Sequence, residues 1–238
     1  MRKILLASRP FLMEIVHDFM MVACIIAPIL MGVVFKLVIP LLEGILCNYF
    51  AKTQIIAPYY IIFDMLLAIM TPILFTFSGV LTMLEEFDIG IAKYYFVTPV
   101  GKRGYLQSRL FLPALIAMLY AMILLIFFNI SNVSFTMILV FSFSGALMAV
   151  ICSMLVVAYA KNKIEGMALI KLCGLLIVGI PVVYFVNSPV QYVFSVLPSF
   201  WLAQLSITGN YLYTLPTVAT SIIIILLLYT KFNRRLEK

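Results

Sequence analysis

Six long apolar stretches dominate the chain, separated by short segments that hold most of its charge. A helix that crosses a membrane needs about 20 mainly apolar residues. Six segments reach this length: 19–40, 58–83, 110–129, 134–158, 167–187 and 211–230. The pattern predicts an all-α integral membrane protein with six transmembrane helices, built as a single transmembrane domain over residues 1–238.

The basic residues predict how these helices are oriented. If the N-terminus is cytoplasmic, fourteen of the sixteen Lys and Arg residues fall on the cytoplasmic side, and only Lys36 and Lys52 fall toward the outside. Cytoplasmic loops of membrane proteins carry such an excess of Lys and Arg. Both chain ends are therefore expected in the cytoplasm. The net charge of +7 then reports orientation and does not indicate a nucleic-acid-binding patch.

Composition argues against a soluble protein. Hydrophobic residues make up 65% of the chain and charged residues 11%, against roughly 25% charged residues in an ordinary soluble domain. No cytoplasmic loop reaches the roughly 40 residues at which a domain begins to fold unaided. We therefore expect a multi-pass protein of a cell (inner, cytoplasmic) membrane, and the Ile- and Lys-rich composition favours a bacterial source. Residues 1–17 form either an interfacial helix or a short irregular tail.

The residue patterns of several enzyme classes are missing. There is no GxxxxGK[ST] loop, which excludes ATP hydrolysis by that route. His17 is the sole histidine, so the chain lacks a ligand cluster for zinc. The four cysteines are scattered and predict no disulfide framework. We therefore expect no catalytic residues, no metal site and no cofactor site on this chain.

Charged side chains are rare inside the predicted helices. Lys36 and Asp64 lie at similar depth near the outer ends of the first two helices, so an intramembrane ion pair between them would reduce the cost of both charges. Contact with a substrate or ion, and simple snorkelling of Lys36, are the other interpretations. Lys171 lies close enough to the inner end to snorkel.

The most informative loop follows the second helix. Glu85, Glu86 and Asp88 open it, and acidic residues favour a helix N-terminus. Apolar and aromatic residues then recur at helical spacing as far as Phe96, which predicts a short amphipathic helix. Pro99 ends this helix, because the residue before a proline disfavours the α region. Such a helix either anchors to lipid headgroups or docks in a groove on a cytoplasmic partner.

The segment before the last helix is long, apolar and uncharged. It contains Pro198 and Trp201, with Tyr192 upstream. Water would not solvate such a stretch, so we predict that it is re-entrant or lies in the outer leaflet, with Trp201 and Tyr192 near the interface. Separately, Phe75-Thr76-Phe77-Ser78-Gly79 resembles Phe141-Ser142-Phe143-Ser144-Gly145. These small residues either let helices approach closely or share a functional role.

In layout and in its first inner loop, the chain resembles the permease subunits of type-2 ATP-binding-cassette exporters. That family has six helices, an acidic-then-glycine segment after helix two, a Thr-Pro before helix three, and a proline-aromatic segment before the last helix. The matching residues are Glu85, Glu86, Gly90, Thr98, Pro99 and Arg109, with Pro198 and Trp201 in the last segment. The sequence departs from the family at Asp88-Ile89, where relatives often carry a basic residue nearby.

The resemblance implies a transport subunit rather than an enzyme. Its inner loop would form the coupling helix, seated on a separate P-loop ATPase that holds ATP and magnesium. The implied ATPase-coupling residues are Glu85, Glu86, Gly90, Tyr95, Thr98, Pro99 and Arg109. Two permease chains, identical or related, would enclose the pathway, in contact with membrane lipid and not with nucleic acid.

The cargo is expected to be amphipathic or hydrophobic, such as a drug, a lipid or a small peptide, and to move outward. The Met- and Phe-rich interior suits such a cargo, although it also suits plain packing. Two alternatives stay open. One is a non-transporting sensor or immunity module that binds a partner through the same loop, and the other is a secondary carrier working alone.

Overall fold

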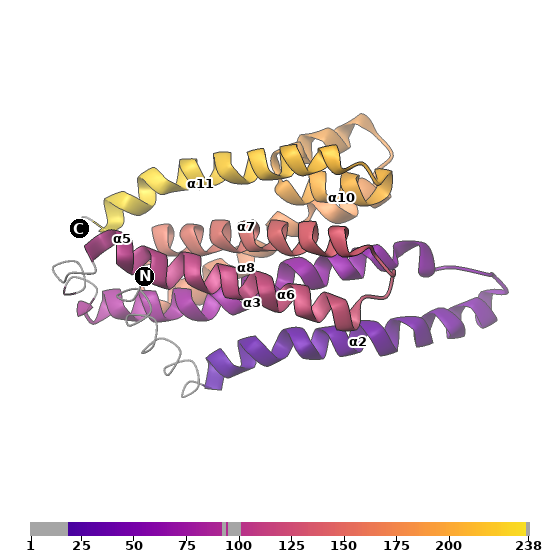
Figure 1. The fold of residues 1–238 in the computed structure, drawn as a ribbon, viewed down its shortest axis with the longest axis horizontal. Coiled ribbons are helices and arrows are strands. Elements are labelled where there is room, and N and C mark those ends of the chain that lie inside the picture. Colours follow the sequence, from indigo (N-terminus) through magenta and orange to yellow (C-terminus); the bar gives the residue numbers. More distant parts are fainter. Residues whose placement is uncertain (1–18, 92–93, 95–100, 237–238) are drawn as a thin grey trace.

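The computed structural model describes residues 19–91, 94 and 101–236, which form helices joined by short connections (Figure 1). Within these residues there is no strand, and six segments are long and apolar enough to cross a membrane. The spans are Val22–Phe50, Ala57–Asp88, Gly104–Phe128, Phe135–Tyr159, Lys163–Phe185 and Tyr211–Phe232. The predicted all-α fold with six spanning helices is confirmed.

The part of the chain that the structure describes contains fourteen elements with defined bounds. In chain order they are α2 (Phe19–Phe50), η1 (Ala57–Tyr59), α3 (Tyr60–Asp88), α5 (Gly101–Leu106), η2 (Gln107–Phe111), α6 (Leu112–Phe128), α7 (Phe135–Tyr159), α8 (Lys163–Cys173), η3 (Gly174–Ile177), α9 (Gly179–Phe185), η4 (Pro189–Val196), α10 (Pro198–Thr208), η5 (Tyr211–Tyr213) and α11 (Thr214–Leu236).

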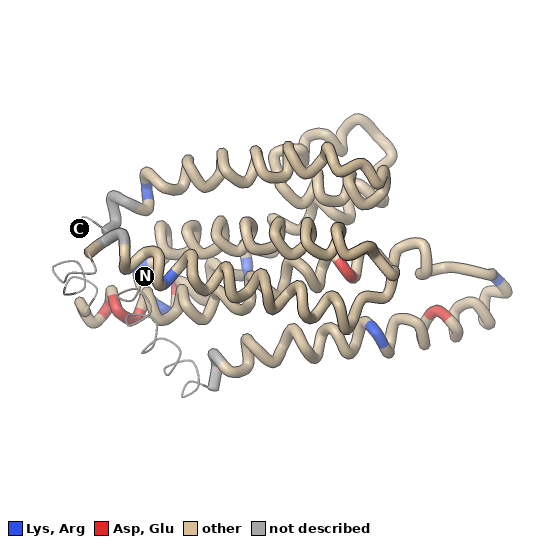
Figure 2. Tube along the Cα trace, viewed as in Figure 1, with Lys and Arg blue, Asp and Glu red and all other residues tan. Residues whose placement is uncertain are grey.

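Helices α3 and α7 form the centre of the bundle. Most of their side chains are buried, whereas α2 and α11 lie on opposite flanks and expose apolar faces (Figure 1). Because six spans bring the chain back to the side where it started, α2 begins and α11 ends at the same end of the bundle. Charged residues gather at this end, which we call the inner end after the orientation that the basic residues predict (Figure 2).

A glycine sets the distance between the two central helices. A Cβ atom built on Gly145 of α7 would lie 2.3 Å from the carbonyl oxygen of Ala68 on α3. This is backbone contact, which neither helix can relieve by turning a side chain. The second of the two repeated motifs in the sequence therefore serves helix packing at its glycine.

Replacing Gly145 by alanine is expected to destabilise the fold by about 1–3 kcal/mol, because α3 and α7 must move apart. Gly44→Ala is the matched control: no atom lies within 4 Å of its Cβ position, and alanine is the better helix former. Thermal unfolding of both variants in the same detergent measures the difference. Equal melting temperatures for the two variants would contradict the close packing.

The first helix continues ten residues past its predicted end at residue 40, because Pro40 does not break it. Membrane helices tolerate proline where other groups satisfy the freed carbonyls. Near the tip of α2, the Glu43 carboxylate accepts hydrogen bonds from the backbone N–H groups of Ile55 (2.8 Å) and Ile56 (2.6 Å). These bonds hold the connection between α2 and η1 against α2, and the outer loop is shorter than predicted.

The predicted re-entrant segment is confirmed by the packing of α9 and α10. Tyr184 near the end of α9 hydrogen-bonds to Ser206 near the end of α10 (2.8 Å), and Gly179 at the start of α9 packs on the backbone of Phe200 near the start of α10. The two helices therefore run in the same direction, and the chain between them turns back inward through η4. Since Gly179 lies six residues before the end of its span, the chain re-enters by about 9 Å.

Protein covers the start of α10, whereas η4 has no buried residue. Pro198 and Phe200 are buried. The Trp201 indole N–H donates to the carbonyl of Ser195 (2.7 Å), and its ring stacks on Tyr213 with centroids 6.1 Å apart. Trp201 thus joins η4, α10 and the start of the last span.

Candidate functional site

Three acidic residues occupy the last turn of α3 at the inner end. The sequence predicted that they open a new helix, and this was wrong: α3 runs through Asp88, and Gly90 ends it with a φ of +80°. The negative end of a helix dipole disfavours acidic side chains. Each carboxylate therefore needs a donor from another element, and each has one.

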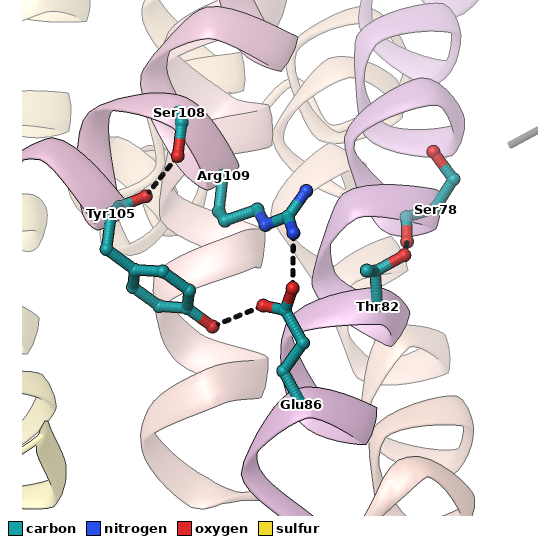
Figure 3. Close-up of polar contacts among 6 residues, drawn as sticks. All are labelled: Ser78, Thr82, Glu86, Tyr105, Ser108 and Arg109. Atoms are coloured by element: carbon teal, nitrogen blue, oxygen red, sulfur yellow. Dashed lines mark hydrogen bonds and ion pairs between the residues drawn. The ribbon is translucent and has the colours of Figure 1, made fainter. Parts of the chain in front are cut away.

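Glu86 lies at the centre of a buried polar cluster with Arg109 and Tyr105 (Figure 3). One carboxylate oxygen forms an ion pair with Nη2 of Arg109, and the other accepts a hydrogen bond from the Tyr105 hydroxyl at 2.7 Å. Arg109 is 3% exposed and Tyr105 1% exposed. We call Glu86, Tyr105 and Arg109 the inner cluster. It fastens the end of α3 to the segment that leads into α6.

A local irregularity places Arg109 in this cluster. Residues Gln107–Phe111 (η2) form a π-helical turn in which the N–H of Leu112 bonds to the carbonyl of Gln107. Pro113 follows directly and has no N–H for the carbonyl four residues back, which favours such a disruption. Tyr105 and Arg109 are four residues apart, so both side chains leave the same face toward α3. Turns of this kind recur at functional sites.

The other two acids of α3 contact the start of α8. The Glu85 carboxylate pairs with the Lys163 ammonium at 2.7 Å, and the Lys163 backbone N–H lies 3.4 Å from a carboxylate oxygen of Asp88. Both side chains of the Glu85–Lys163 pair are partly exposed. The inner ends of the second, third and fifth spans therefore meet at the last turn of α3.

The structure separates the sequence-predicted coupling residues into three groups. Glu86 and Arg109 come together in the inner cluster, Glu85 faces α8, and Gly90 ends α3. Tyr95, Thr98 and Pro99 lie outside the described residues, so their role in coupling stays a prediction. Within residues 19–91, 94 and 101–236, no three His, Cys, Asp or Glu side chains gather as a metal site would require.

Two members of this inner network were not among the predicted site residues. Tyr105 is recognisable afterwards by its four-residue spacing from Arg109 on one helix face. Lys163 carries no such signal, because its partner lies 78 positions away in the sequence.

The predicted ion pair between Lys36 and Asp64 is not formed. The Lys36 ammonium donates instead to the carbonyl of Phe127 in the last turn of α6. Asp64 accepts from the backbone N–H groups of Ile130 and Ser131, both at 3.0 Å, and from the Ser131 hydroxyl. Both side chains bind the turn between α6 and α7 and not each other. The turn offers a carbonyl to the Lys36 ammonium and backbone N–H groups to the Asp64 carboxylate.

An open groove lies on the outward face of η2 and α6. Gln107, Phe111, Leu112 and Leu115 line it, and its volume is about 390 Å³. Small-molecule sites commonly measure about 300–1,000 Å³ and combine apolar walls with a few polar groups. The groove is therefore large enough for a drug-sized molecule, and Gln107 is the polar group among the described residues that line it.

Comparison with known proteins agrees with this architecture. A family model described as "Fluoroquinolones export permease protein Rv2686c-like" matches residues 11–232. Similar curated proteins are the fluoroquinolones export permease proteins Rv2686c and MT2760, from two strains of Mycobacterium tuberculosis. Each is 25% identical over 190 residues, which are 79% of this chain and 75% of the relative. No solved structure matches the chain.

Proposed function

Because the chain belongs to the fluoroquinolones export permease family, we propose that it is the membrane-spanning subunit of an ATP-binding-cassette exporter in a bacterial cytoplasmic membrane. A separate P-loop ATPase would bind ATP and magnesium and supply the energy. The predicted resemblance to exporter permeases is confirmed by the family match. Beyond the family match, we propose the ATPase partner and the cargo.

The observation that carries the proposal is the inner cluster. The chain leaves α3 at Gly90 and returns at Gly101, so the cluster bonds together the two helices on either side of this loop. A force on the loop would therefore move α3 and α6 as one unit. Glu85 and Lys163 extend the connection to the fifth span. This arrangement supports the proposal that the loop is seated on an ATPase.

The fifth span offers a route from the inner end to the re-entrant segment. Its helix is interrupted by the 3-10 turn η3 between α8 and α9, and such interruptions often mark hinges. The Ser199 hydroxyl of α10 hydrogen-bonds to the carbonyl of Leu176 within η3. Movement of α8 would therefore reach α10 and open the outer end for release of the cargo.

We expect the cargo to be an amphipathic, drug-sized molecule. The relatives are named for fluoroquinolones, which are planar aromatic molecules with polar ends. The groove at Phe111 and Leu115 supports entry of such a molecule from the inner leaflet. A second permease chain, identical or related, would pair with this one through an apolar flank of the bundle. A secondary carrier is less well supported, since Asp64, the deep acid, already accepts three hydrogen bonds.

The proposal predicts that a P-loop ATPase copurifies with the chain from its native membrane in mild detergent. Replacing Tyr95 or Pro99 by alanine should reduce the recovered ATPase about tenfold, because these residues belong to the predicted coupling helix. Tyr49→Ala is the matched control: Tyr49 is an exposed aromatic residue at the outer end, which an inner ATPase does not reach. Quantitative mass spectrometry of the purified complexes measures the ratio.

Recovery of the intact chain without any ATPase, in several mild detergents, would contradict the exporter proposal. An ATPase that stays bound to the Tyr95 and Pro99 variants would place the coupling contact elsewhere on the inner end. Stimulation of ATPase activity by a fluoroquinolone would separate a transporter from a sensor or immunity module.

A further inference from the structure

Lys36 lies at membrane depth on an exposed face of α2. The span Val22–Phe50 has 29 residues and is about 42 Å long, and Lys36 stands at its middle. The hydrocarbon core of a bilayer is about 30 Å thick. Lys36 therefore falls within the apolar layer. Its ammonium bonds to Phe127, one residue before the outer end of the third span, and so lies in the outer part of that layer, where a charged side chain is costly.

The position of this lysine is fixed by close packing between α2 and α6. A Cβ on Gly32 would lie 2.8 Å from the ring of Phe128, and the Tyr120 hydroxyl donates to the carbonyl of Ile25 at 2.7 Å. Lys36 follows Gly32 by one helical turn and so lies on the same side. Its ammonium emerges where the α2–α6 contact meets the surrounding lipid.

No carboxylate among the described residues forms an ion pair with Lys36. The ion pairs there join Glu86 to Arg109 and Glu85 to Lys163, both at the inner end. Asp64 is occupied by Ile130 and Ser131 on the other side of the turn. The carbonyl of Phe127 carries the partial negative charge of a helix C-terminus, which offsets only part of a full positive charge.

We propose that Lys36 binds the anionic group, a carboxylate or a phosphate, of an amphipathic molecule lying against α2 and α6 in the outer half of the membrane. An ammonium with two N–H groups left after its bond to Phe127 can donate to such a group. The apolar side chains of Val34 and Leu37, both exposed beside it, would contact the apolar body of the molecule. The anionic group would belong either to an exported cargo or to a lipid headgroup. Only the first of these rests on the proposed function.

The test measures binding to the full chain in phosphatidylcholine nanodiscs, without any ATPase. The probes are a fluorescent fluoroquinolone with its free carboxylate and the methyl ester of the same compound, which lacks the carboxylate charge. We expect the wild-type chain to bind the acid about tenfold more tightly than the ester. Lys36→Gln should abolish this preference and leave the affinity for the ester unchanged, whereas Lys36→Arg should retain it. Lys52→Gln, at an exposed lysine of the outer loop, is the matched control and should behave as wild type.

A second set of nanodiscs containing phosphatidylglycerol distinguishes the two sources. If the acid preference persists in these nanodiscs, the site takes cargo. If it is lost there, and native mass spectrometry finds less retained phosphatidylglycerol on Lys36→Gln than on wild type, the site takes a lipid headgroup. The proposal is overturned if wild type and Lys36→Gln show the same acid-to-ester ratio and retain the same amount of phosphatidylglycerol. That failure leaves ATPase copurification, and hence the proposed function, untouched.

Discussion

Arg109→Ala is expected to destabilise the folded chain by about 3–5 kcal/mol, the largest effect that we predict for a single substitution. Removing the guanidinium takes the ion pair from the buried Glu86 carboxylate and leaves it the hydrogen bond from the Tyr105 hydroxyl. An uncompensated buried charge is far more costly than the loss of the attraction itself. The carboxylate also lies at the negative end of the α3 dipole, which increases the cost. Thermal unfolding in detergent, followed by the monodisperse fraction on size-exclusion chromatography, measures the loss.

Replacing both partners distinguishes a buried charge from lost packing. Glu86→Gln combined with Arg109→Met removes both charges and should recover most of the stability. Lys163→Ala is the matched single substitution at a partly exposed pair, and its cost should be at most about 1 kcal/mol. If Arg109→Ala and Lys163→Ala destabilise the chain equally, the inner cluster does not hold α3 to α6 as we describe.

The sequence was sufficient to predict the six spans because apolar length alone identifies a membrane helix. It could not place the end of α3. Acidic residues after an apolar run ordinarily indicate that one helix has stopped and another starts. Here Glu86 stays in α3 because Arg109 and Tyr105 compensate its charge, and neither residue is near it in the sequence. The helix end is therefore decided by tertiary contacts rather than by local preference.

Asp64 shows a second limit of sequence reasoning. Lys36 and Asp64 both contact the turn between α6 and α7, but pairing also depends on which competing groups lie between them. The link between α6 and α7 is short. Such a turn at the edge of the apolar layer exposes backbone N–H groups that water does not satisfy. The Asp64 carboxylate accepts hydrogen bonds from those N–H groups, so Lys36 donates to a backbone carbonyl instead.

Asp64→Ala is accordingly expected to destabilise the chain by about 2–4 kcal/mol, the second largest effect. Two backbone N–H groups and one hydroxyl lose a charged acceptor at a position that is 1% exposed, and each such bond contributes about 1.5–3 kcal/mol without strict additivity. Ser131→Ala removes only the hydroxyl and should cost about 1 kcal/mol. Asp64→Asn should resemble Asp64→Ala, because the amide presents a donor to one of the two N–H groups. Thermal unfolding of the three variants measures these differences.

If Asp64→Asn were instead as stable as wild type, the negative charge of Asp64 would not be what holds the turn between α6 and α7. Asp64 would then be available as a counter-ion for Lys36.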